Sequence, residues 1–145
     1  MASSTRVVWN DAAEDWLLHA EQGPVGRDLA VKGERVAAEQ RRTCPVSEDG
    51  SHGRESGHMR DQIKSELHRD PVGLYVDIGT DATTPDGYPY PVGVELGTRP
   101  HTITSHGDYP LRNPKTGRVF GKTVQHPGTQ PQPFLRPSLD VLRRE

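Results

Sequence analysis

Seven histidines are the side chains whose chemistry stands out first in this chain of 145 residues. Imidazole binds transition metals and transfers protons, so a histidine cluster would indicate a metal centre. None stands in the HxxxH or HExxH spacing. His101, His106 and His126, with Asp108 or Glu95, could bind a metal only if the fold brought them together, and their spacing does not require this. We expect surface or hydrogen-bonding histidines, no metal and no cofactor, and keep a His-based metal-dependent hydrolase as the alternative from another class.

Nucleophilic chemistry would fall to Cys44, the single cysteine. It stands between a predicted helix and Pro45, where packing is expected, and no charged activator is specified by the sequence. The GxSxG, P-loop and GxGxxG patterns are missing from the sequence. Asp77 and Glu95 each lie within an apolar alternation, which predicts a partly buried carboxylate bonded to a turn. We therefore expect no catalytic residue and no enzymatic activity.

Two short motifs call for defined local structure. In Val94-Glu95-Leu96-Gly97-Thr98 the carboxylate can accept hydrogen bonds from turn N–H groups, and Gly97 permits a φ that other residues avoid. This predicts a strand or a short helix that runs into a pinned turn. Residues 126–145 predict a rigid proline strap, which delivers Phe134 and Leu135, and then a short helix that starts at Pro137 with an apolar edge of Leu139 and Leu142. The strap either packs on its own core or fixes a docking element.

Composition indicates a thin core. Hydrophobic residues make up 31% of the chain and aromatic residues 6%, whereas Gly (15) and Pro (13) are abundant. With a net charge of only −2, obligate assembly with neighbouring subunits is the expected source of the missing burial. A lone cysteine excludes a disulfide framework, and no apolar run or signal-peptide pattern indicates a membrane. We expect a soluble protein of a reducing cytoplasm without the basic excess of a nucleic-acid binder.

The order of elements predicts an α+β fold in one domain, 1–145: two N-terminal helices, a small and mostly antiparallel β-sheet, and the C-terminal strap and short helix. A stripe of Trp9, Trp16 and neighbouring apolar residues marks a helix within 7–20, part of an N-terminal helical extension (1–24), and these tryptophans are expected to be core or interface aromatics. A second helix covers 25–42, and the polar segment 46–57 is expected to be a mobile loop. Leu74, Val76 and Ile78 predict a strand; the remaining expected pieces are a turn at 84–87, the alternation at 92–96, an extended piece at 101–104, and a hairpin around a turn at 113–117.

Charge is distributed unevenly. Residues 46–100 hold 10 acidic and 5 basic residues, a net of −5, and residues 101–145 hold 3 acidic and 7 basic, a net of +4. The two regions either neutralise each other within one subunit or attract neighbouring copies head to tail. We expect the basic hairpin to contact either DNA or an acidic patch on a neighbouring subunit, and we favour the protein contact; its basic residues are Arg112, Lys115, Arg118 and Lys122.

Six motifs occur in an order that resembles a known family, the small tail-component proteins of long-tailed bacteriophages, which are encoded among the head–tail connector genes. The resemblance covers roughly residues 25–143; its motifs are 44–46, 56–63, 90–98, 117–120, 126–129 and 133–137. Cys44, where a small residue is usual, and the long loop at 46–57 depart from the family pattern.

The resemblance implies a structural virion protein made in the host cytoplasm and located at the neck, where typically six copies form a ring for tail completion and head–tail joining. Its partners would be other copies, head-closure or connector proteins, and tail-tube or tail-terminator proteins, with non-specific contact to channel DNA as a further option. A tail terminator or head-closure protein is the alternative within this class. The residues expected at subunit or neck interfaces are Trp9, Trp16, Glu95, Gly97, Thr98, His126, Pro127, Gly128, Pro133, Phe134, Leu135 and Arg136.

Overall fold

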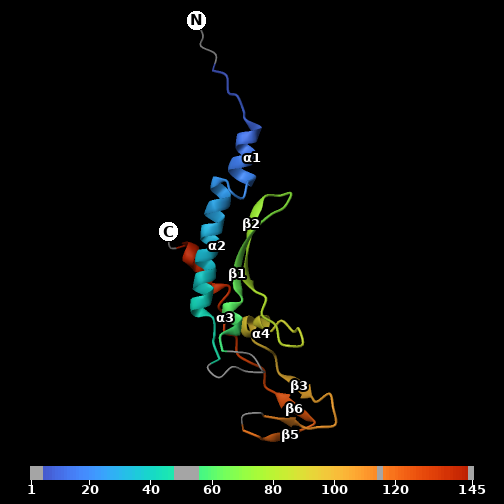
Figure 1. Ribbon diagram of the computed structural model, residues 1–145. Helices are drawn as coiled ribbons and strands as arrows, with labels where there is room; N and C mark the ends of the chain where they lie inside the picture. Colours follow the sequence, from blue (N-terminus) through green and yellow to red (C-terminus); the bar gives the residue numbers. More distant parts are fainter. Residues whose placement is uncertain (1–4, 48–55, 114–115, 144–145) are drawn as a thin grey trace. The chain divides into compact units, whose positions relative to one another are not determined.

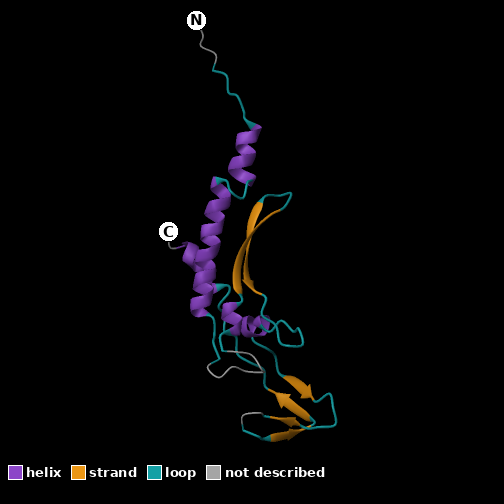
Figure 2. Cartoon of the chain, viewed as in Figure 1, coloured by secondary structure: helices purple, strands orange, loops and turns teal. Residues whose placement is uncertain are grey.

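The computed structural model describes residues 5–47, 56–113 and 116–143. It confirms the α+β class: these residues form one long helix, α2, several shorter helices, and three antiparallel two-stranded sheets, β1–β2, β3–β6 and β4–β5 (Figures 1 and 2). The elements in chain order are α1 (Asp11–His19), α2 (Pro24–Thr43), α3 (His58–Asp61), β1 (Ile63–Arg69), β2 (Leu74–Thr80), α4 (Pro91–Leu96), β3 (His101–Thr104), β4 (Leu111–Arg112), β5 (Val119–Gly121), β6 (Thr123–His126) and the 3-10 helix η1 (Pro137–Arg143).

Two compact units divide the chain. The first consists of residues 1–81 together with 135–145, and the second of residues 82–134. The single phage-type domain stays a prediction, because two structural units can belong to one evolutionary domain. Most of the expected mobile loop at 46–57 lies outside the described residues, as does Lys115 of the basic hairpin.

The first unit is built on α2, which begins with Pro24 in its first turn and lies along the β1–β2 hairpin (Figure 1). Its buried face includes Val36 and Ala37, as the spacing predicts. A Cβ added to Gly33 would come within 2.4 Å of Ser65 Oγ and 2.6 Å of Val76 Cγ1. This glycine therefore allows the helix to approach the hairpin closely.

The C-terminal helix starts at Pro137, as expected, but it is a 3-10 helix and packs on α2. The expected apolar edge is wrong in part, because Leu139 is half exposed while Ser138 is fully buried. The carbonyl oxygen of Leu135 accepts hydrogen bonds from Ser138 Oγ and from Gln40 Nε2 (3.5 Å). In a 3-10 helix side chains repeat every three residues, so the face spacing of an α-helix does not apply.

The N-terminal helix α1 contains no buried residue. Asn10 caps it by accepting a hydrogen bond from Ala13 N, and Arg69 pairs with Asp15 at 3.2 Å. Trp9 is 70% exposed and Trp16 53%, so the prediction that they form part of the chain's own core is wrong. The interface alternative stays a prediction.

In the second unit, the turn at 84–87 forms as predicted, with Gly87 N donating to Thr84 O at 2.8 Å. The alternating segment at 92–96 is helical, not extended: α4 begins with Pro91 and ends at Leu96, directly before Gly97, which confirms the short-helix option. The turn at 113–117 closes β4 on β5 through Gly117 N and Asn113 O (2.8 Å).

Candidate functional site

The structure joins the two motifs singled out in the sequence. Thr98, directly after α4, forms an antiparallel bridge with Thr129 in the strap, with N–H···O distances of 3.1 and 3.2 Å. The two hydroxyl groups lie 3.1 Å apart, and Thr129 N also contacts Thr98 Oγ1 at 3.0 Å. We call the set of Glu95, Gly97, Thr98, Gly128, Thr129 and Phe134 the Gly-Thr clasp.

The clasp requires glycine at two places. Gly97 has φ 70° and Gly128 has φ 85°, both in the left-handed region that L side chains avoid. A Cβ on Gly97 would lie 2.5 Å from the carbonyl oxygen of Thr129. A Cβ on Gly128 would lie 2.2 Å from the carbonyl oxygen of Thr98. Because both obstacles are backbone atoms, the two segments can be this close only with glycine at both positions.

A buried carboxylate completes the clasp. Glu95, 6% exposed, accepts a hydrogen bond from Phe134 N at 2.7 Å, and Gln132 N donates to Val94 O at 2.8 Å. The prediction of a buried carboxylate is thus confirmed for Glu95, but the predicted partner is wrong, because the donor is a backbone N–H of the strap and not of a nearby turn. Asp77 is exposed and does not take this role.

Two of the three candidate histidines meet. His101 and His126 are opposite each other in the β3–β6 ladder, with ring centroids 5.0 Å apart. His101 Nδ1 bonds to Arg99 O, and His126 Nδ1 accepts from Gly128 N (3.1 Å). Each of these hydrogen bonds occupies one ring nitrogen and holds the nearby backbone in place. Among the described residues, no group of three or more His, Cys, Asp or Glu side chains is placed to hold a metal ion.

The buried members of the clasp correct part of the predicted interface. Phe134 is fully buried within the single chain and Glu95 nearly so, so neither is available to a neighbouring subunit in this conformation. Thr98, Pro127, Pro133 and Arg136 are exposed, and Gly97, His126, Gly128 and Leu135 are half-buried. The first interpretation of the strap, packing on its own chain, holds for Phe134.

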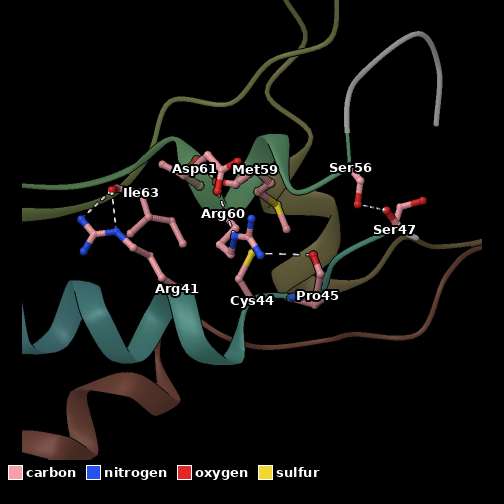
Figure 3. Close-up of polar contacts among 10 residues, drawn as sticks. Arg41, Cys44, Pro45, Ser47, Ser56, Met59, Arg60, Asp61 and Ile63 are labelled. Atoms are coloured by element: carbon pink, nitrogen blue, oxygen red, sulfur yellow. Dashed lines mark hydrogen bonds and ion pairs between the residues drawn. The ribbon is translucent and has the colours of Figure 1, made fainter. Parts of the chain in front are cut away.

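Cys44 occupies the end of α2, and its packing role is confirmed (Figure 3). Its thiol lies by Pro45 O at 3.7 Å, and the Arg41 guanidinium bonds to Ile63 O at 2.9 and 3.3 Å. Burial raises the pKa of the Cys44 thiol to about 11, against a smaller lowering by the charge of Arg60. A thiol of this kind is protonated near neutral pH and is a poor nucleophile.

A shallow polar groove of about 270 Å³ lies on the hairpin of the first unit. Lys64 pairs with Asp81 at 2.6 Å and with Glu66 at 3.6 Å, and the pKa of Lys64 is raised by its hydrogen bond to Asp81. The residues that line the groove are Lys64, Glu66, Asp77, Ile78, Gly79, Thr80 and Asp81. No sequence pattern indicates this groove, because its members become neighbours only through the β1–β2 register.

The basic hairpin is exposed along the β5 strand. Arg118 lies over the Phe120 ring, 5.2 Å from its centroid, and Lys122 pairs with Asp108 at 3.8 Å. Arg112 is also exposed. The hairpin therefore presents cations together with an aromatic side chain.

No family model, curated protein or solved structure matches the chain. In the part of the chain that the structure describes, no helix combines the length and the apolar character needed to cross a membrane.

Proposed function

We propose that this protein is a structural subunit of the bacteriophage neck, in which copies form a ring that completes the tail and joins it to the head. The observation that carries the proposal is the Gly-Thr clasp: two of the motifs that resemble the neck family, far apart in the sequence, meet in one conformation that needs both glycines. Two motifs that together form one local structure support the resemblance more strongly than short matches considered one at a time.

Incomplete burial also supports assembly. Within the described residues each sheet has only two strands, and such ribbons are marginally stable in water by themselves. All residues of β3 and β5 are exposed. A subunit whose N-terminal helix and ribbons leave this much surface exposed gains stability by packing on neighbouring copies.

The test uses a phage whose genome carries this reading frame interrupted by an amber codon. In a non-suppressing host we expect DNA-filled heads and separate tails in electron micrographs, with joined particles restored by the intact protein from a plasmid. Tails of normal length support a joining ring, whereas over-long tails identify a tail terminator. Normal particle yield would overturn the proposal.

A second experiment locates the protein. An antibody against it, applied to intact virions, is expected to label the head–tail junction. Labelling of the capsid shell or the tail tip would contradict a neck position.

A further inference from the structure

The N-terminal segment carries apolar side chains that the described part of the chain leaves largely exposed. Val7 is 83% exposed, Val8 75%, and α1 buries none of its nine residues. Isolated helices shorter than about 12–15 residues are marginal in water, so packing of the apolar face must supply the missing stability. Trp9 and Trp16 add a large apolar area to this face, and the exposure of that area to water is unfavourable.

The second unit carries another uncovered surface, on its ribbons. Tyr109 is 84% exposed, Val119 57% and Phe120 42%. Arg118 lies over the Phe120 ring, and Arg112 is the register partner of Val119 in the β4–β5 hairpin. This surface is apolar with a basic rim.

The charges of the two surfaces are complementary. Residues 5–21 hold one basic and four acidic residues, a net of −3. Residues 101–126 hold four basic residues and one acidic residue, a net of +3. Each surface combines exposed aromatic side chains with charge, and the net charges of the two surfaces are opposite in sign.

We propose that α1 of one copy docks on the β4–β5 ribbon of a second copy. The contact places Trp9 and Trp16 against Val119 and Phe120, while the acidic rim of α1 faces the arginines. Because the two surfaces differ, the contact is heterologous, and its repetition forms a ring or a filament. The inference rests on the proposed self-assembly and identifies the surfaces that carry it.

Two other occupants fit the charges less well. A phosphate backbone would suit the ribbon but would leave the apolar face of α1 uncovered and be repelled by its acidic residues. Helices that lie on anionic membranes carry Lys and Arg on their polar face, whereas α1 carries Asp11, Glu14 and Asp15. A second copy covers both surfaces at once.

The test reverses each surface separately in the full chain. One variant carries Asp11→Lys with Glu21→Lys, and the other carries Arg112→Glu with Arg118→Glu. Light scattering after gel filtration is expected to show oligomers for the parent and a single-chain mass for each variant. A chain with all four substitutions restores opposite signs, and we expect it to assemble again, which separates lost pairing from simple misfolding.

Mixing the two variants gives a sharper outcome. The intact α1 of one variant fits the intact ribbon of the other, and the two reversed surfaces also carry opposite signs, so the mixture is expected to form oligomers although each variant alone stays a single chain. An interface in which both copies use the same patch does not predict this, because one of the two variants would leave that patch unchanged and would assemble by itself. Adding Trp16→Ala to both variants is expected to weaken the mixed oligomers about tenfold or more.

Defined results overturn the inference. Oligomers of parental size in both single-surface variants would place self-assembly elsewhere and leave the proposed neck function standing. A parent that stays a single chain at all concentrations would contradict self-assembly itself. If the variants keep the oligomeric mass of the parent but lose binding to duplex DNA, the surfaces bind nucleic acid instead. If they keep that mass but lose the shift in tryptophan fluorescence that phosphatidylglycerol vesicles cause, the surfaces bind lipid instead.

Discussion

The Glu95 carboxylate accepts a hydrogen bond from the backbone N–H of Phe134, 39 residues further along the chain, at 2.7 Å. Both residues are buried, and the bond joins the end of α4 to the end of the strap. A buried N–H has no access to water, so its partner must come from the fold. Glu95 therefore acts as an internal tie, and this explains a carboxylate in a thin core.

Removing that tie should destabilise the protein. Glu95→Ala leaves the N–H of Phe134 without this acceptor and is expected to cost about 1–3 kcal/mol of the free energy of unfolding. Glu95→Gln keeps a carbonyl acceptor and should cost less. Urea unfolding measures both, with the exposed Glu66→Gln as the control. Equal stability of Glu95→Ala and the parent would contradict the role of the bond.

The two glycines of the clasp can be compared with a glycine of the same conformation. Gly128 and Gly87 both have φ 85°, but only at Gly128 would a Cβ meet backbone atoms; Gly87 has nothing within 4 Å. Gly87→Ala should cost about 1 kcal/mol from backbone strain alone. Gly128→Ala should cost clearly more, since Thr98 O must also move. Thermal unfolding of the two variants gives the comparison, and similar losses would show that the close approach is not needed.

Phe134→Ala should destabilise the isolated chain and not only the assembly. The side chain is 0% exposed in one copy, so its truncation is expected to cost about 3–5 kcal/mol. The measurement is denaturant unfolding at a protein concentration low enough to keep copies apart. A stability loss seen only in assembled protein would restore the interface role that the sequence predicted.

Much of the first unit could be predicted from sequence. The helix at 24–43 and the strand at 74–80 follow from clear apolar periods, a first-turn proline and basic residues at the helix end. The segment at 92–96 was ambiguous, because Val92, Val94 and Leu96 fit a strand by alternation. Pro91 in the first turn and Gly97 after the last are the local signals that the helix follows.

The clasp could be predicted only in its parts. Gly97-Thr98 indicated a turn and Gly128-Thr129 belonged to the predicted strap, but no local pattern states that two segments 31 residues apart bridge each other. The tryptophans show the opposite limit. Their spacing predicts an apolar helix face correctly, but not whether the chain itself supplies what covers that face.

Gly33 offers a test of helix-on-hairpin packing. In an exposed helix Gly→Ala would stabilise by about 1 kcal/mol, because alanine has the higher helix propensity. Here the added Cβ meets Ser65 Oγ and Val76 Cγ1, so Gly33→Ala should destabilise instead. Combining it with Val76→Ala removes one obstacle and should cost less than the sum of the single changes. Additive losses, measured by urea unfolding, would exclude a direct clash.

Ionisation of Cys44 is expected to make the stability of the folded protein depend on pH in the alkaline range. Burial raises the pKa of its thiol from 9.0 to about 11 in the folded chain. In the unfolded chain the thiol ionises near pH 9, so between pH 9 and 11 the unfolded state holds fewer protons and folding stability falls as the pH rises. Below pH 9 both states keep the proton, and Cys44 causes no pH dependence.

The measurement is the free energy of unfolding of the parent and of Cys44→Ala at each pH. The difference between the two removes the contribution of the tyrosines, which both proteins share. We expect the parent alone to show the additional fall, together with slow alkylation by iodoacetamide at pH 8. Alkylation of the folded protein as fast as that of the urea-unfolded chain would contradict the buried, protonated thiol.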